Sequence, residues 1–384
     1  MDVLALERCV GDVDRFRERH WGRAPLVHSE AAKRVHAFDD IASLNDLDHL
    51  VASVGLHASS VRMVRGGKAV PVSAYTDSAA KSSRLADPLV SAPLVYERFS
   101  EGATIVLESL HRYWKPLTDF CRDLEIALGH RLQTNAYITP PNSQGFDVHR
   151  DDHDVLVLQV SGAKHWVVFG RESDDVLIDQ DIERGDVLYI PKGFPHAATT
   201  GRSASAHLTV GILTHDSIDV VREVVKLAEE EPLFRERLSG GGAIDPTALR
   251  KEVERNLEEM RAWLDKVDVD ELTERVARRM RTTSLPVFRG QLRQLQLLET
   301  LGDQTRVARR RGATCALFGR EGALRVLLAD RELEMPIGAA PAMEAISRRE
   351  SLRVADLHEF LTPDSSMVLV RRLVREGLLE IVDP

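Results

Sequence analysis

The hydrophobic and polar positions of the chain follow a strand-like pattern between about residues 60 and 215. Short apolar runs such as RLQTNAYIT, DVLVLQV, KHWVVF, DVLYI and AHLTVGIL are bounded by Gly, Pro, Asn and Asp. Runs of this kind are typical of an antiparallel sandwich or barrel. Ser161 and Gly162 separate two of the runs by the length of a hairpin turn. Ahead of the strands, the pattern predicts a helix from about Val106 to Leu128, interrupted near Pro116.

Helical spacing replaces the strand pattern after His215. In PTALRKEVERNLEEMRAWLDKV an apolar residue recurs every three or four positions from Leu249 to Leu264, and DELTERVARRM repeats this spacing. Each stretch therefore predicts a charged helix with one apolar stripe. Nothing within the segment is expected to cover the stripes, so we expect them to pack on another domain or on a second subunit.

The last hundred residues alternate again. ATCALFG and ALRVLLAD read as strands, LRVADLHEFL as a short helix, SSMVLVRRLVREG as a second helix and LLEIV as a closing strand. This order is typical of a winged helix.

Length and composition bound the class of protein. A chain of 384 residues predicts two or three domains, and 43% hydrophobic and 29% charged residues are typical of a globular protein without a membrane span. The N-terminal MDVLALERCVGDVD lacks the features of a signal peptide, so we expect a cytoplasmic protein. The cysteines Cys9, Cys121 and Cys315 are too far apart to suggest a disulfide framework. A net charge of -9 argues against a surface built to coat nucleic acid.

The stretch HRDDHD carries the densest ionisable cluster. On a strand, His149 and Asp151 would share a face, but Asp147 and His153 have the same parity, so spacing alone leaves the pair open. His196 follows a later apolar run in a turn rich in Gly and Pro. Two histidines and one carboxylate form the facial triad of non-haem Fe(II) oxygenases. The alternative is an ordinary charged surface turn.

Lys164 opens the run after Gly162. A lysine that faces the inside of an apolar sandwich needs an anion, and a dicarboxylate would supply one. A solvated lysine at a strand end is the alternative.

Several motifs in order carry a family resemblance. GATIVLESLHRYW, TNAYITPPNSQGFDVHRDDHDVLVLQVSGAKHWVVFG, RGDVLYIPKGFPHAA and AHLTVGI resemble the JmjC-type, cupin-fold 2-oxoglutarate oxygenases of the ribosomal oxygenase group, and HWGRAPLVH and the C-terminal pattern fit the same group. The resemblance implies a mixed, mainly β fold: a double-stranded β-helix (jelly-roll or cupin barrel) with N-terminal helical elements in residues 1–215, a helical dimerisation region in residues 216–284 and a winged-helix-like domain in residues 285–384.

The resemblance also implies the site residues. The metal ligands fall on His149, Asp151 and His196, which selects Asp151 over His153. The residues that bind 2-oxoglutarate fall on Lys164, Asn135, Tyr137 and Thr209. Gly211 departs from the pattern, because a serine or threonine on this strand often helps to hold the co-substrate and Gly211 has no side chain. No further catalytic side chain is implied, and His153 has no assigned role.

The implied activity is Fe(II)-, 2-oxoglutarate- and O2-dependent hydroxylation of a protein side chain, a His or Arg of a ribosomal protein, by a homodimer. Hydroxylation of another peptide or of a small metabolite would share every motif, and histone demethylation fits the domain plan less well. A cupin with another metal is disfavoured, because such cupins often pair His-x-His with glutamate.

An alternative from another class is a ligand-sensing regulator that binds DNA through the winged helix. It would use the arginines of this region: Arg306, Arg309, Arg310, Arg311, Arg371, Arg372 and Arg375. Because the chain is acidic overall and the last helix is largely apolar, we do not expect DNA binding.

Overall fold

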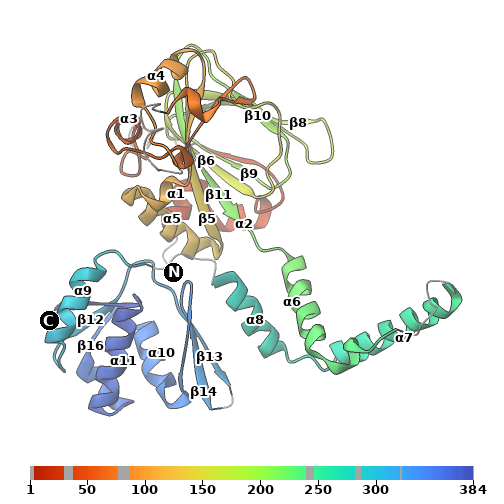
Figure 1. The fold of residues 1–384 in the computed structure, drawn as a ribbon, viewed down its shortest axis with the longest axis vertical. Helices are drawn as coiled ribbons and strands as arrows, with labels where there is room; N and C mark the ends of the chain where they lie inside the picture. Colours follow the sequence, from red (N-terminus) through yellow and green to blue (C-terminus); the bar gives the residue numbers. More distant parts are fainter. Residues whose placement is uncertain are drawn as a thin grey trace. The chain divides into compact units, whose positions relative to one another are not determined.

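The chain divides into two compact units, residues 1–214 and 215–384, each described here by itself. The computed structural model describes residues 4–29, 38–76, 87–238, 246–281, 287–320 and 322–383 (Figure 1). Among these residues, no helix combines the length and the apolar character that a membrane span requires.

Two antiparallel sheets form the centre of the first unit. The larger sheet has the strand order β1-β9-β6-β11-β5-β4-β2-β3, and the smaller has the order β10-β7-β8. The strands of the larger sheet are, in chain order, β1 Leu26–His28, β2 Val61–Arg65, β3 Lys68–Ala69, β4 Thr104–Leu107, β5 Arg131–Thr139, β6 Asp154–Ser161, β9 Val187–Ile190 and β11 Ser205–Leu213. Those of the smaller sheet are β7 Ala163–Phe169, β8 Val176–Glu183 and β10 His196–Thr199.

The packing of strand β6 explains why its sequence is apolar at almost every position. Val155 and Val157 pack into a cluster with side chains of the smaller sheet such as Trp166. Leu156 and Leu158 point to the other face and join the large core beneath the helices. Because both faces of the strand are covered, the alternation expected of a half-exposed strand is absent. The mainly β core is as expected from the sequence.

The helices of the first unit cover the larger sheet (Figure 1). They are α1 Leu4–Val10, α2 Val13–Arg19, α3 Leu44–Ser53, α4 Ala92–Ser100 and α5 Lys115–Leu128. The predicted single helix from Val106 to Leu128 is wrong in its first part, because Val106 belongs to β4 and a 3-10 turn follows. Pro116 lies in the first turn of α5, where a missing N–H removes no helical hydrogen bond, so it begins the helix and does not interrupt it.

The turn at Ser161 and Gly162 does not form the expected hairpin. Strand β6 pairs with β9 and β11, whereas β7 pairs with β8 and β10, so the turn carries the chain from one sheet to the other. Gly162 has φ 62°, and a Cβ at this position would lie 2.2 Å from the carbonyl oxygen of Ala204. Only glycine fits this crossing, which brings Lys164 to the inside of the barrel.

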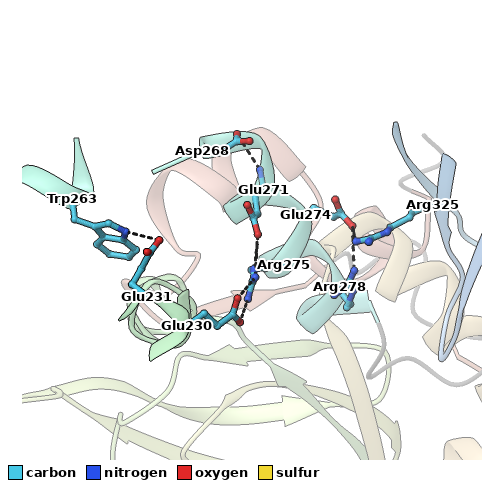
Figure 2. Close-up of polar contacts among 9 residues, drawn as sticks. All are labelled: Glu230, Glu231, Trp263, Asp268, Glu271, Glu274, Arg275, Arg278 and Arg325. Atoms are coloured by element: carbon cyan, nitrogen blue, oxygen red, sulfur yellow. Dashed lines mark hydrogen bonds and ion pairs between the residues drawn. The ribbon is translucent and has the colours of Figure 1, made fainter. Parts of the chain in front are cut away.

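The second unit begins with the helices α6 Ser217–Glu230, α7 Pro246–Leu264 and α8 Val269–Arg281. Arg275 of α8 binds both carboxylate oxygens of Glu230 at 2.7 Å, and it also contacts Glu271 (Figure 2). The indole of Trp263 donates to Glu231 at 3.1 Å. These contacts tie α7 and α8 to the end of α6. The apolar stripe of α7 stays half exposed at Val253, Leu257 and Leu264.

The rest of the second unit contains two small sheets with the orders β16-β12-β17 and β13-β14-β15. The strands are β12 Arg306–Arg309, β13 Ala316–Arg320, β14 Ala323–Leu327, β15 Glu332–Pro336, β16 Ser351–Arg353 and β17 Leu379–Asp383, and the helices are α9 Gln291–Leu297, α10 Ala340–Arg348 and α11 Pro363–Arg375. The buried Glu274 of α8 accepts hydrogen bonds from Arg278 and from Arg325 of β14 (Figure 2).

The segment LRVADLHEFL is not one short helix, because it begins with β16 and continues as a 3-10 helix over Val354–Glu359. Helix α10 was not anticipated. The expected domain boundary between residues 284 and 285 lies outside the described residues.

Candidate metal centre

Three side chains that are far apart in the sequence meet at one point. His149, Asp151 and His196 each offer a ligand atom, and these atoms lie within 4.8 Å of one another. Nε2 of His196 is 3.5 Å from Oδ2 of Asp151, and Nε2 of His149 is 4.0 Å from Oδ1. Two imidazoles and one carboxylate at this spacing could hold a divalent transition metal and leave coordination positions open.

The hydrogen bonds of the two histidines leave Nε2 of each ring free to bind a metal. Nδ1 of His149 lies 2.8 Å from the carbonyl oxygen of Asp147, and Nδ1 of His196 lies 3.0 Å from that of Phe194. Since a carbonyl only accepts, Nδ1 carries the hydrogen in both rings and Nε2 keeps its lone pair. Burial lowers the pKa of His196 below its ordinary value, which favours the neutral form that a metal requires.

A buried carboxylate links the two ligand-bearing segments. Asp154, at the start of β6, accepts the backbone N–H of Lys192 at 2.8 Å and the hydroxyl of Tyr189. The N–H of Gly193 donates to the carbonyl of Asp151 at 3.0 Å. These bonds hold the turn before His196 against the loop that carries Asp151.

The conformation of residues 149–153 explains why the alternation of faces along a strand could not identify the metal ligands. Strand β6 begins only at Asp154, so residues 149–153 are not in a strand apart from one bridge between His149 and His196. The alternation of faces that the parity argument assumed therefore does not apply to Asp151 and His153.

A pocket of about 210 Å³ adjoins the three side chains. The structure brings all of the sequence-predicted site residues to its wall: His149, Asp151, His196, Lys164, Asn135, Tyr137 and Thr209. Gly211 and His153 also line it.

Lys164 is the most unusual of these residues. Its side chain is buried, and its Nζ donates to Oγ1 of Thr139 at 3.1 Å. Among the described residues, no carboxylate forms an ion pair with it. Burial lowers its pKa from 10.5 to about 8. A buried cation without an anionic partner indicates that the site is built for an anionic ligand.

Several lining residues were missed by the sequence reasoning, and two of them carry buried ring nitrogen atoms. Nε1 of Trp166 and Nδ1 of His207 are buried and have no hydrogen-bond partner within the described part of the chain. The ring of His207 stacks on Tyr137 with centroids 5.0 Å apart, and its burial lowers its pKa well below the ordinary value. Both could have been found by alternation, because Trp166 is two residues from Lys164 and His207 is two residues from Thr209.

Asn135 and Tyr137 have structural roles as well. Oδ1 of Asn135 accepts the N–H of Ser109, a residue with left-handed backbone, at 2.8 Å. Burial raises the pKa of Tyr137, so its hydroxyl stays protonated and can donate into the pocket. Asn135 therefore supports the wall as well as lining it.

Comparison with known proteins places this site in a named domain. Residues 113–220 match the family model of the JmjC domain. Ribosomal oxygenase 1 of Gallus gallus is 28% identical over 223 residues, covering 53% of this chain and 35% of the relative. The bifunctional lysine-specific demethylase and histidyl-hydroxylase NO66 of Drosophila grimshawi is 28% identical over 225 residues, covering 53% and 30%. The chain thus spans about a third of the length of these curated relatives.

The structural match extends much further than the sequence match. The ribosomal oxygenase YcfD of Escherichia coli is similar with a TM-score of 0.56 and 19% identity, over 97% of this chain and 98% of that one. The expected resemblance is confirmed for the domain and the fold. Residues 113–220 thus match the JmjC domain, and the fold of the chain is similar to that of a ribosomal oxygenase over nearly its whole length.

Proposed function

We propose that this protein is an Fe(II)- and 2-oxoglutarate-dependent oxygenase that hydroxylates a side chain of a ribosomal protein, a His or an Arg. One observation carries the proposal. A triad of two histidines and one carboxylate shares a pocket with a buried lysine for which the described residues offer no carboxylate partner.

His149, Asp151 and His196 would hold the metal. The donor set fits Fe(II), because both Nε2 atoms are free to bind and the carboxylate faces them. The ligands come from segments that hydrogen bonds already hold together, so the protein orients them before the metal binds.

The opposite end of the pocket fits a dicarboxylate. Lys164 would pair with the distal carboxylate of 2-oxoglutarate, with Thr139 holding the ammonium in place. Tyr137, Asn135 and Thr209 would line the co-substrate, and the unpartnered indole N–H of Trp166 favours a ligand that carries oxygen acceptors. With metal and co-substrate bound, the chemistry supplied is decarboxylation of 2-oxoglutarate to succinate and CO2, coupled to hydroxylation of a C–H bond by O2.

The substrate class rests on the relatives. Two of them are named as a ribosomal oxygenase and a histidyl-hydroxylase, and the E. coli protein has been solved with cobalt and 2-oxoglutarate. A peptide of another origin or a small metabolite remains the competing substrate.

The domain plan is part of the proposal. Residues 1–215 would be the catalytic domain, residues 216–284 a dimerisation region and residues 285–384 a winged-helix-like domain. The half-exposed apolar residues of α7 support a homodimer, because a second copy would cover them. A monomer by analytical ultracentrifugation would contradict this part.

The DNA-binding alternative has less support. Arg310 is buried and donates to the backbone carbonyls of Val287 and Arg289 and to the side chain of Gln291. Its guanidinium group therefore donates to acceptors within the second unit. Salt-sensitive binding of duplex DNA would revive the alternative.

The direct test is turnover of the co-substrate. The purified protein with Fe(II), O2 and 2-oxoglutarate is expected to form succinate, and omission of iron or substitution of His149→Ala is expected to abolish it. Succinate formation that does not depend on iron would contradict the proposal.

A further inference from the structure

The register of β5 and β11 sets Gly211 apart from Thr139 along the barrel wall. Gly211 pairs with Gln133, whereas Ser205 pairs with Thr139, the residue that holds Lys164. Gln133 and Thr139 are six residues apart on β5, which is roughly 20 Å along a strand. Gly211 and Gln133 therefore line the part of the pocket that lies farther from Thr139 along these strands.

His153 lies beside Gly211 in this part of the pocket. A Cβ on Gly211 would lie 2.6 Å from Nε2 and 2.7 Å from Cδ2 of the His153 ring. The ring therefore fills the space where the resemblance leads one to expect a serine or threonine side chain. His153 is two residues from Asp151, and β6, which it precedes, pairs with β11 at Val155 and Gly211. This part of the pocket is therefore the part near the metal triad.

The hydrogen bonding of His153 defines what it can recognise. Nδ1 lies 2.8 Å from Oδ1 of Asp152, so this nitrogen carries the hydrogen. Nε2 is then an acceptor, and it has no partner within the described residues. Gln133 lies on the other side of Gly211, with its Cγ 3.3 Å from the position that a Cβ on Gly211 would take. Its amide likewise has no side-chain partner in the described ranges.

We propose that His153 is the specificity-determining residue for the substrate: its Nε2, with Gln133 beside it, accepts a hydrogen bond from an N–H of the side chain to be hydroxylated. This inference rests on the proposed function and identifies the part of the site that recognises the substrate side chain. A side chain without an N–H, such as that of leucine or norleucine, leaves the acceptor unpaired and is rejected.

The test uses binding without turnover. Full-length protein is loaded with Mn(II) and N-oxalylglycine, an unreactive analogue of 2-oxoglutarate. The probes are N-acetyl-histidinamide, N-acetyl-argininamide and N-acetyl-norleucinamide, and the paramagnetic relaxation of their protons by Mn(II) reports binding beside the metal. We expect the wild type to bind at least one N–H-bearing probe more tightly than the norleucine probe.

Variants then assign the contact. His153→Ala is expected to weaken binding of that probe by about three- to tenfold, the effect of one hydrogen bond, and to leave the affinity for N-oxalylglycine unchanged. Gly211→Ser displaces the ring and gives the same loss, and the double variant His153→Ala/Gly211→Ser adds nothing further. His165→Ala is the matched control, because His165 lies outside the pocket between Asp179 and Asp181 and its removal is expected to change neither affinity.

Each contrary outcome has a separate meaning. Wild-type probe affinity in His153→Ala overturns the inference, and so does a loss of N-oxalylglycine binding in its place, since His153 would then be a co-substrate residue. Failure of the wild type to bind Mn(II) and N-oxalylglycine overturns the proposed function, and the inference with it.

Discussion

His149 and His196 are joined by a reciprocal pair of backbone hydrogen bonds. The N–H of His149 donates to the carbonyl of His196 at 3.1 Å, and the N–H of His196 donates back at 2.9 Å. The positions of both ligands are thus fixed by the backbone and not by their imidazoles. Removal of one imidazole is therefore expected to affect metal binding much more than folding.

His149→Ala is therefore expected to remove the metal without unfolding the protein. The side chain of His149 is 42% exposed, so we expect the free energy of unfolding of the metal-free protein to change by less than about 0.5 kcal/mol. The affinity for Mn(II), measured by calorimetry, is expected to fall by more than about 100-fold. Unchanged metal affinity would show that His149 is not a ligand.

Lys164→Met is expected to have opposite effects on stability and on co-substrate binding. The lowered pKa of the buried ammonium corresponds to roughly 3 kcal/mol of unfavourable burial, so the ligand-free variant is expected to be more stable by up to this amount. Its affinity for N-oxalylglycine is expected to fall by about 30-fold or more. Lys115→Met, at an exposed lysine of α5, is the matched control and should change neither property. A less stable ligand-free Lys164→Met variant would contradict the account.

The same lysine predicts how stability and binding depend on pH. Its pKa in the folded protein is about 8, below its ordinary value of 10.5, so the buried charge destabilises the ligand-free protein below pH 8. That penalty is relieved as the pH rises from about 8 to 10.5, and the free energy of unfolding gains this contribution. Co-substrate affinity follows the opposite course, because it needs the cation, and it is expected to fall by up to about tenfold for each pH unit above the pKa. In Lys164→Met both contributions should vanish.

Gly162→Ala tests the crossing between the two sheets. A Cβ at this position would lie 2.2 Å from the carbonyl oxygen of Ala204, and φ is 62°. Since the backbone cannot move aside easily, we expect the free energy of unfolding to fall by at least about 2 kcal/mol. Gly201→Ala is the control, because a Cβ there meets no atom within 4 Å. Equal stability of the two variants in denaturant titrations would argue against the constraint.

The sequence allowed the strands and the members of the site to be predicted more readily than their connections. Tyr137 and Thr209 were found because motifs carry them, and the apolar runs around them are strands. The turn at Gly162 was misread because a two-residue turn has the same sequence whether it joins paired strands or crosses between sheets. Pro116 was misread because proline both begins and breaks helices.

The site shows the same limit at His153. Its relation to Gly211 could not be predicted, because it depends on two strands that are adjacent only in the folded sheet. The choice of Asp151 as a ligand came from family resemblance, since the loop before β6 does not follow strand alternation.

The central claim is tested most directly by mass spectrometry of ribosomal proteins from cells that contain the wild-type protein, the His149→Ala variant or neither. We expect one histidine- or arginine-containing peptide to gain the mass of a single oxygen atom only with the wild type. If no ribosomal peptide gains oxygen with the wild type, or if the same peptide gains it with His149→Ala, the proposed function is wrong.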